Sequence, residues 1–282
     1  MNMPMIVSKF GGSATASAHT IKNVVNISKN HNRKILVFSA IGKEYEYDTK
    51  TTDLLFEYTK ANENDKKRIE TQVVEKFKRL KSRLNIEYNV ESEWKQIFYY
   101  FKISQDKNLL VSRGEFITSK MMAKALKMYF VPAERLFYFK DEKVDYPKTK
   151  RALEGYLKTY KRIVVPGFYG IDENEKIVLL SRGGSDVSAA VFAKVACADK
   201  YENWTDVNGV YEKDPRLENS KQIRHMGYDQ LCTLTENGAK VIHKDCAKLL
   251  KNTNISLIVR SILDPGTTPT IISENQKFFQ KE

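Results

Sequence analysis

The feature that most constrains the fold lies between residues 177 and 195, where an apolar run, a glycine turn and an apolar helical segment follow one another. The run IVLL at 177–180 has the length and composition of a buried strand. Residues 181–186 (SRGGSD) form a tight turn, and Val187, Ala190 and Val191 follow at helical spacing. In such a unit the N–H groups at the helix start form an anion site that glycines leave accessible. The pattern predicts an α/β protein with a ligand site at this turn.

A second unit of the same kind opens the chain. Residues 5–10 (MIVSKF) indicate a buried strand, and residues 35–38 (ILVF) indicate another. Between them a helix is marked by Ile21, Val24, Val25 and Ile27, with Ser17 or Thr20 as its N-cap. Strand, helix and strand with short connections predict a parallel sheet with right-handed crossovers. Further strands are expected at 136–139, 163–165, 255–259 and 270–272, and helices at 57–101 and 116–130.

The composition narrows the class of protein. The 282 residues suffice for one large domain or for two lobes that share a sheet. No apolar run approaches the roughly 20 residues that span a bilayer, and no signal peptide precedes the first strand, so we expect no membrane association. Three scattered cysteines indicate reduced thiols and a cytoplasmic protein. Neither they nor the four histidines have metal-site spacing, so we expect no metal held by side chains.

The net charge of +12 suits anionic ligands, such as a nucleotide or an acidic amino acid, and equally suits a nucleic acid. The lysines and arginines of residues 60–83 lie among acids along helical segments, which favours a solvated helix face over a binding role. Residues 98–101 (FYYF) are either an exposed patch for a partner or, as the pattern favours, part of a core or subunit contact.

Lys9 precedes Gly11 and Gly12 at the end of the first predicted strand. Phosphoryl transfer needs positive charge and hydrogen-bond donors at the transferred group, and a lysine beside glycine N–H groups supplies both. From this segment alone, a lysine that caps a strand end in solvent is an equal alternative. Neither a GxxxxGK[ST] nor a GxGxxG pattern occurs, so a Walker A loop and a dinucleotide fold have no support.

Four motifs in the order found in a known family cover nearly the whole chain. They are KFGGS at 9–13, SRGGSD at 181–186, WTDVNGVYEKDPR at 204–216 and GAKVIHKD at 238–245. Together they resemble the matching segments of aspartokinases, within the wider amino-acid-kinase fold. The resemblance implies a three-layer αβα sandwich around a mainly parallel sheet. It also implies one catalytic domain over 1–272, with an amino-acid-binding lobe at 1–175, a nucleotide-binding lobe at 176–272 and a polar tail at 273–282.

The resemblance implies a role for each matching residue. The catalytic residues would be Lys9, Asp186 and Lys240. Lys9 and the amides of Gly11 and Gly12 would hold the γ-phosphoryl group, Lys240 would face it from the nucleotide side, and Asp186 would orient Lys9. The residues that bind the acceptor substrate would be Ser39, Thr52, Glu115, Arg182 and Ser185. Those that bind the nucleotide would be Lys9, Gly11, Gly12, Ser13, Thr205, Asp206, Tyr211, Lys213, Arg216 and Lys240.

For three of these residues the implied role is chemically reasonable, and an ordinary structural role is the alternative. Glu115 would accept the substrate's ammonium group, or it is a first-turn acid of the helix at 116–130. Arg182 would clamp a carboxylate with two parallel hydrogen bonds, or it forms an ordinary salt bridge. Asp186 would organise Lys9, or it is an N-terminal helix acid. The chain also departs from the family pattern, with a longer loop at 43–50, Asp53 in place of asparagine, and Lys244 where proline is common.

The reaction that the resemblance implies is transfer of the γ-phosphoryl group of ATP to L-aspartate, with Mg²⁺ bridging phosphate oxygens. This is the first step toward lysine, threonine and methionine. The regulatory ACT units common in aspartokinases are expected to be absent, and a homodimer is expected, although the sequence itself is silent on oligomeric state. Two alternatives stay open. One is another kinase of the same fold with a different carboxylate or phosphate acceptor, and the other is a non-catalytic module that binds nucleic acid.

Overall fold

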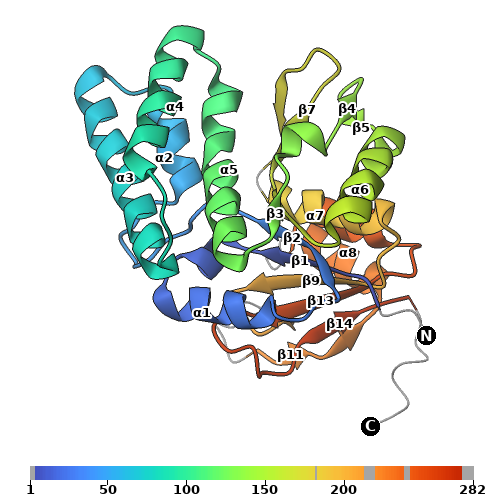
Figure 1. Ribbon diagram of the computed structural model, residues 1–282. Coiled ribbons are helices and arrows are strands. Elements are labelled where there is room, and N and C mark those ends of the chain that lie inside the picture. The colour runs from blue at the N-terminus through green and yellow to red at the C-terminus, as the bar shows by residue number, and fades with distance from the viewer. Residues whose placement is uncertain (1–3, 182, 213–219, 238–241, 275–282) are drawn as a thin grey trace.

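The computed structural model describes residues 4–181, 183–212, 220–237 and 242–274. Within these ranges an eight-stranded sheet forms the centre of the molecule, with strand order β12-β14-β13-β9-β1-β2-β6-β3 (Figure 1). Its members are β1 (Ile6–Phe10), β2 (Arg33–Phe38), β3 (Tyr129–Phe130), β6 (Ile163–Pro166), β9 (Lys200–Thr205), β12 (His225–Met226), β13 (Ser256–Ser261) and β14 (Thr270–Ile272). Only the pairing of β13 with β14 is antiparallel among these strands.

The order of the strands reverses between β1 and β9. From β1 the chain runs through β2 to β6 on one side, whereas β9 and β13 follow on the other side. At such a reversal the connections leave in opposite directions and open a crevice at the carboxyl ends of the strands. The end of β1 therefore lies where an α/β sheet usually binds its ligand.

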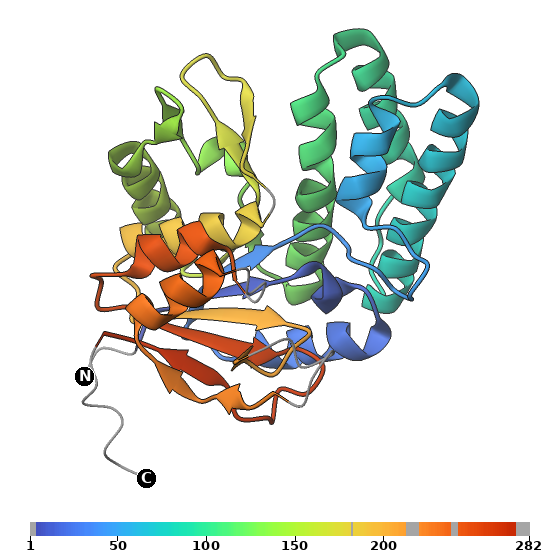
Figure 2. The same ribbon diagram turned by 180° about the vertical axis from the view of Figure 1, so that it is seen from behind.

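Helices cover both faces of the sheet and make a three-layer sandwich. They are α1 (Ala18–Ile27), α2 (Thr51–Tyr58), α3 (Glu63–Leu84), α4 (Val90–Ser104), α5 (Lys107–Leu126), α6 (Tyr146–Tyr160), α7 (Gly184–Val195), α8 (Tyr228–Glu236) and α9 (Lys244–Leu250), with 3-10 turns η1 (Gly12–Thr15) and η2 (Ala133–Arg135). One core joins α7, α8 and α9 to one face, and a second joins α1 and α5 to the other (Figure 2). The predicted α/β sandwich around a mainly parallel sheet is confirmed.

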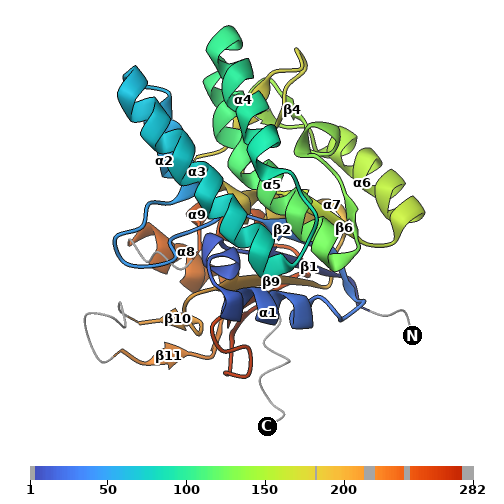
Figure 3. The same ribbon diagram turned by 60° about the vertical axis from the view of Figure 1, so that its left-hand side comes forward.

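The long helices α2 to α5 form a lobe with its own core (Figure 3). Large aromatic side chains fill this core, with the rings of Phe77 and Trp94 5.0 Å apart and those of Tyr58 and Phe98 4.7 Å apart. Within the FYYF segment, Phe98 and Phe101 are buried in this core whereas Tyr99 and Tyr100 face solvent. The interpretation of the segment as core packing therefore holds for its two phenylalanines.

Three short hairpins complete the described structure. They are β4 (Phe139–Lys140) with β5 (Lys143–Val144), β7 (Tyr169–Ile171) with β8 (Ile177–Leu179), and β10 (Val210–Tyr211) with β11 (Gln222–Ile223). The strand predicted at 177–180 is present as β8, but it is only partly buried, because it is a hairpin arm outside the central sheet. The run is apolar on both sides since Val178 packs on the main core and Leu179 on the core of the helical lobe. The glycine turn nevertheless leads directly into α7, as predicted.

Two other boundaries differ from the sequence prediction. The helix expected at 116–130 begins at Lys107 and ends at Leu126, so Glu115 lies in its interior and is not a first-turn acid. Gly114 made this segment resemble a turn, but a Cβ at that position would approach the Ala40 Cβ to 3.0 Å. The glycine therefore permits close packing of α5. The strand expected at 136–139 is reduced to β4, because residues 136 and 137 follow η2.

Candidate functional site

An ion pair lies at the carboxyl end of β1, where the strand order reverses. The Nζ of Lys9 is 2.7 Å from Oδ1 of Asp186, and both side chains are about nine-tenths buried. Asn203 on β9 lies beside the pair, since its amide is 3.5 Å from both Lys9 Nζ and Asp186 Oδ1. The sheet register places Lys9 opposite Asn203, whereas Asp186 comes from the first turn of α7. The structure thus brings together Lys9 and Asp186 from two distant motifs.

The start of α7 also approaches the start of α9. The backbone N–H of His243, the N-cap of α9, donates to Oδ2 of Asp186 at 3.3 Å. Gly183 precedes α7 with φ at +87°, and a Cβ there would lie 2.8 Å from the His243 ring. Only glycine avoids both that clash and the strain of the left-handed conformation. Asp186 therefore accepts hydrogen bonds from β1, β9 and α9 and fixes their positions relative to one another.

The glycine turn after β1 is packed closely against the loop that follows β2. A Cβ on Gly12 would lie 2.9 Å from the Gly42 Cα, and the Gly42 N–H donates to the Gly12 carbonyl at 2.9 Å. The N–H of Gly11 donates to the Trp204 carbonyl at 3.1 Å. The expectation that the Gly11 amide holds a phosphoryl group is therefore not met in this structure, because that donor is used within the sheet. Gly12 and Ser13 are half-buried at the turn.

A buried carboxyl group faces the same loop from α5. Glu115 is 3% exposed, and its Oε1 accepts from the Thr52 hydroxyl at 3.4 Å. Its Oε2 has no partner among the described residues. Burial raises the pKa of Glu115 to about 8, although hydrogen bonds from the Ala40 backbone and Thr52 act in the opposite direction. A buried acceptor without a partner is costly in an empty protein and is satisfied when a cation binds.

Two further residues predicted for acceptor binding lie near this edge of the sheet. Ser39 directly follows β2, and its N–H donates to the Phe10 carbonyl at 3.1 Å. Ser185 is buried at the start of α7, where a Cβ on Gly167 would approach the Ser185 Cβ to 2.7 Å. Arg182 lies outside the described residues. The structure thus places Ser39 at the end of β2, next to β1, and Ser185 beside Asp186.

The residues predicted for nucleotide binding are only partly described. Thr205 ends β9, and its hydroxyl donates to the Asp206 carboxylate at 3.1 Å. Tyr211 lies in β10 and is half-buried. Lys213, Arg216 and Lys240 lie outside the described residues. The predicted approach of Lys240 to Lys9 is therefore still a prediction.

Sequence reasoning missed three residues that form the site. Asn203 sits between Lys9 and Asp186, and His243 and Gly42 make the backbone contacts described above. The signal for Asn203 was available, because the segment KYENWT places two polar residues inside a buried strand. Buried polar residues in a strand need partners and therefore indicate a network. The contacts of His243 and Gly42 depend on tertiary packing and have no local signal.

Two general properties complete the description. Among residues 4–181, 183–212, 220–237 and 242–274, no group of three or more His, Cys, Asp or Glu side chains is arranged to hold a metal ion. In the same part of the chain, no helix is long and apolar enough to cross a membrane.

The mainly parallel sheet, with its charged cluster at the reversal of strand order, defines a doubly wound α/β protein with a ligand site at that edge. A model of the amino acid kinase family matches residues 4–261. The chain therefore belongs to the amino acid kinase family.

Curated relatives of the chain are aspartokinases. It is 30% identical to one from Bacillus sp. (strain MGA3) and 28% identical to one from Rickettsia prowazekii, and each match covers 96% of this chain. It spans only 59% and 55% of those relatives' lengths. The crystal structure of Clostridium acetobutylicum aspartate kinase superposes with a TM-score of 0.87 at 29% identity, and covers 99% of this chain and 64% of that one.

Proposed function

We propose that the protein is an aspartate kinase, which transfers the γ-phosphoryl group of ATP to the side-chain carboxylate of L-aspartate and releases 4-phospho-L-aspartate and ADP. The observation that carries the proposal is that two buried groups lie at the carboxyl ends of the strands. One is a lysine, and the other is a carboxyl group with an oxygen that has no partner among the described residues. Lys9 offers a cation to a phosphoryl group, and Glu115 offers an acceptor to an ammonium group. An amino acid kinase needs both.

The chemistry requires no general base. A side-chain carboxylate is ionised near neutral pH, so one of its oxygens attacks the γ-phosphorus directly. The bond from that phosphorus to the bridging oxygen breaks, and ADP leaves with the electron pair. Lys9 stabilises the charge on the transferred group, and Asp186 holds the Lys9 ammonium in place at 2.7 Å. Catalysis therefore rests on alignment and charge compensation.

The two substrates divide between the two halves of the chain in this proposal. Residues 1–175 bind the amino acid through Ser39, Thr52 and Glu115, together with Arg182 and Ser185 from the neighbouring turn. Residues 176–272 bind Mg-ATP through the loop at 205–216 and Lys240, with the turn at Gly12 and Ser13 at the γ-phosphate. A Mg²⁺ ion would enter with the nucleotide, since this ion usually keeps several waters and binds substrate phosphates, and it would supply charge compensation at the transferred group.

The relatives support this choice of substrate. They are aspartokinases, and a crystal structure of Escherichia coli aspartokinase III that contains aspartate and ADP shares the fold, with a TM-score of 0.82 at 21% identity. The acceptor still needs a direct test, because the loop at 43–50 and Asp53 depart from the aspartokinase pattern.

The test is an ADP-release assay with Mg-ATP and a panel of acceptors, paired with hydroxylamine trapping of the acyl phosphate. We expect turnover with L-aspartate that far exceeds turnover with L-glutamate, N-acetyl-L-glutamate or a nucleoside monophosphate. Glu115→Gln serves as the matched variant and should lose activity toward L-aspartate. Turnover with another acceptor and none with L-aspartate would replace this assignment by another kinase of the family. Salt-sensitive nucleic-acid binding without ATP turnover would contradict a kinase altogether.

A further inference from the structure

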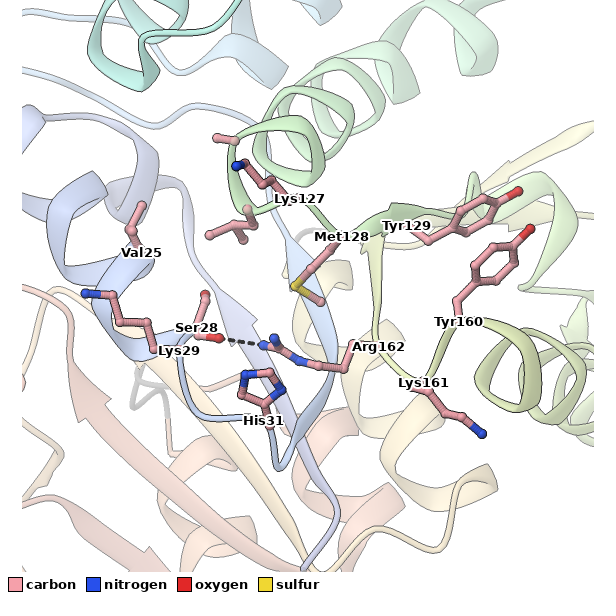
Figure 4. A pocket seen from close by; sticks show the side chains of 12 residues that line it. Val25, Ser28, Lys29, His31, Lys127, Met128, Tyr129, Tyr160, Lys161 and Arg162 are labelled. Atoms are coloured by element: carbon pink, nitrogen blue, oxygen red, sulfur yellow. Dashed lines mark hydrogen bonds between the residues drawn. The ribbon is translucent and has the colours of Figure 1, made fainter.

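A cavity lies at the amino ends of the strands, on the side of the sheet away from the carboxyl end of β1 where Lys9 lies. It has a volume of about 790 Å³ and lies where α1, α5 and α6 end and where β3 and β6 begin (Figure 4). Its lining consists of Val25, Ser28, Lys29, His31, Ala125, Leu126, Lys127, Met128, Tyr129, Tyr160, Lys161 and Arg162. Because Lys9 lies at the carboxyl end of β1, this cavity at the amino ends of the strands is separate from the site described above.

The lining of the cavity is strongly cationic. It includes Lys29, Lys127, Lys161 and Arg162 together with His31, and no aspartate or glutamate occurs among its described lining residues. In Figure 4 the amine of Lys161 points away from the others, so the positive charge of the cavity comes mainly from Lys29, Lys127 and Arg162. A concave surface of one sign concentrates ions of the opposite sign.

Arg162 is held rigidly at the wall of the cavity. Its Nη2 donates to the Ser28 carbonyl at 2.5 Å and its Nε donates to the Arg33 carbonyl at 3.1 Å. Its Nη1 has no partner among the described residues. Burial and the nearby Arg33 lower the pKa of the Arg162 guanidinium. The positive charge at this wall is thus incompletely compensated, and a guanidinium that is already oriented loses little freedom when it binds an anion.

Ser28 supplies an independent observation. It is 4% exposed, and its hydroxyl has no hydrogen-bond partner among the described residues. Figure 4 shows Ser28 between Lys29, His31 and Arg162. An unsatisfied buried hydroxyl is unfavourable in an empty protein. The oxygen itself is shielded from solvent in this structure, so a ligand oxygen in the cavity would satisfy it after a rotation of the Ser28 side chain.

The ends of the surrounding helices explain only part of this arrangement. Lys127 and Lys161 are C-caps of α5 and α6, and lysine near a helix C-terminus is favourable. Each helix end, however, carries only about half a negative charge, which is less than the charge of the lysine beside it. The C-terminus of α1 accounts for the orientation of Arg162, which donates to the carbonyl of the C-cap Ser28, but the helix ends leave the Ser28 hydroxyl unexplained.

We propose that this cavity binds a small phosphate-bearing metabolite. A phosphate group carries almost two negative charges and three acceptor oxygens on one atom, and this matches a hydroxyl, a guanidinium and lysine ammonium groups better than a carboxylate does. The cavity is in the size range of sites for whole organic ligands and is much larger than one phosphate group. Val25, Leu126 and Met128 line it, and the stacked rings of Tyr129 and Tyr160, 3.4 Å apart, offer an aromatic wall. The metabolite therefore carries an apolar or aromatic part.

Calorimetric titration with inorganic phosphate, phenyl phosphate and benzoate tests the proposal. Phenyl phosphate should bind most tightly, by about fivefold over inorganic phosphate, because an aromatic contact adds roughly 1 kcal/mol. Benzoate has the same ring with a single charge and should bind most weakly. Benzoate binding as tight as that of phenyl phosphate would overturn the choice of phosphate, and no saturable binding of phenyl phosphate would overturn the site.

Variants that remove positive charge from the lining test whether phenyl phosphate binds in this cavity. The double variant Lys29→Gln/Lys127→Asn should weaken phenyl phosphate about tenfold or more, because each lost charged hydrogen bond is worth roughly 1.5–3 kcal/mol. Asparagine is chosen at 127 because it tolerates the left-handed backbone found there. The control Lys60→Gln/Lys95→Gln removes the same charge from exposed positions on the helical lobe and should leave the affinity unchanged. If both double variants weaken the affinity for phenyl phosphate equally, the effect comes from the net charge of the protein, and the proposal is overturned.

Two more variants separate this cavity from the proposed catalytic site and from a structural role. Lys9→Ala should keep full affinity for phenyl phosphate, whereas loss of binding there would assign the ligand to the catalytic edge. Ser28→Ala should weaken phenyl phosphate about fivefold, in line with roughly 1 kcal/mol for a hydrogen bond. The same variant should retain or raise the thermal midpoint of the empty protein, because it removes an unsatisfied buried hydroxyl. Unchanged affinity in Ser28→Ala would contradict the hydroxyl contact.

Discussion

Two buried glutamates, each 3% exposed, lie in regions with opposite character. Glu202 on β9 faces α1, and its Oε2 accepts from Ser8 Oγ at 2.9 Å, Arg33 Nε at 2.7 Å and Trp204 Nε1 at 3.0 Å. Its Oε1 accepts from Arg33 Nη2 at 2.9 Å. Among the described residues, Glu115 at the carboxyl ends of the strands has only weak contacts to one oxygen and none to the other.

The difference shows which buried charge maintains the fold and which is available to a ligand. Both oxygens of Glu202 have hydrogen-bond partners, so Glu202 holds β1, β2 and β9 together. Glu115 has one oxygen without a partner among the described residues, and burial raises its pKa to about 8, so the empty protein keeps it protonated near neutral pH. Strands β1 and β9 contribute to both the structural network and the candidate site. Ser8 and Glu202 point to one face of the sheet, and Lys9 and Asn203 point to the other.

The largest expected effect is on stability. Glu202→Gln removes the charge that compensates Arg33 and should lower the free energy of unfolding by about 3–5 kcal/mol, as is typical when one partner of a buried ion pair is lost. Urea denaturation at neutral pH measures it. At a temperature where the variant is folded, kcat should stay near that of the parent. A large fall in kcat with little loss of stability would reverse the comparison between the two faces.

Lys9→Ala should show the opposite pattern. Removal of the ammonium group should lower kcat by roughly 10²–10³-fold, about 3–4 kcal/mol in activation free energy, as for other groups that stabilise transition-state charge. Steady-state ADP release at saturating Mg-ATP and L-aspartate measures it. The urea midpoint should fall less than in Glu202→Gln, because Asn203 and the His243 N–H still contact Asp186. Near-parental turnover in Lys9→Ala would remove the lysine from the mechanism.

The sequence predicted these two regions unequally. The strands at 6–10 and 33–38, the glycine turn before α7 and the placement of Lys9 at a strand end all have local signals, namely apolar runs, glycines and caps. The network around Glu202 joins residues 169 and 194 positions apart, and no local pattern reveals it. The strand at 177–179 is a partly buried hairpin arm although its sequence indicates a fully buried strand, because residues between two cores are as apolar as residues inside a sheet.

The variant Glu115→Gln tests the contrast between Glu115 and Glu202 through its effect on substrate binding. The variant should raise the KM for L-aspartate by roughly 10–100-fold, because a charged hydrogen bond contributes about 1.5–3 kcal/mol. The KM for Mg-ATP should change little, since Glu115 belongs to the acceptor side of the site. Initial rates over a grid of both substrates separate the two constants. An equal rise in both KM values would indicate a general distortion and not a lost ammonium contact.

The pH dependence of the same residue has a definite sign. Below pH 8 the Glu115 carboxyl is protonated and must lose its proton before it pairs with an ammonium group, so kcat/KM for L-aspartate should rise as the pH approaches about 8. The raised pKa also means that this group stabilises the fold fully below about 4.5, and that the contribution is lost as the pH rises through about 8. Urea midpoints and kcat/KM from pH 6 to 8.5 measure both trends. Glu115→Gln should flatten both, and an unchanged profile in the variant would assign the titration to another group.

The smallest effect is expected at Asn203, which follows Glu202 on β9 but faces Lys9 and Asp186. Its contacts to Lys9 and Asp186 are long, 3.5 Å each. The variant Asn203→Ala should therefore raise the activation free energy by about 1 kcal/mol, which lowers kcat about fivefold. Asn203→Asp is the informative partner, because a second carboxylate beside Asp186 should hold the Lys9 ammonium away from the phosphoryl group and reduce kcat further. Parallel measurement of kcat and the urea midpoint separates orientation of Lys9 from packing of β9. If the alanine variant loses stability as Glu202→Gln does but keeps its kcat, Asn203 belongs with the structural network and not with the site.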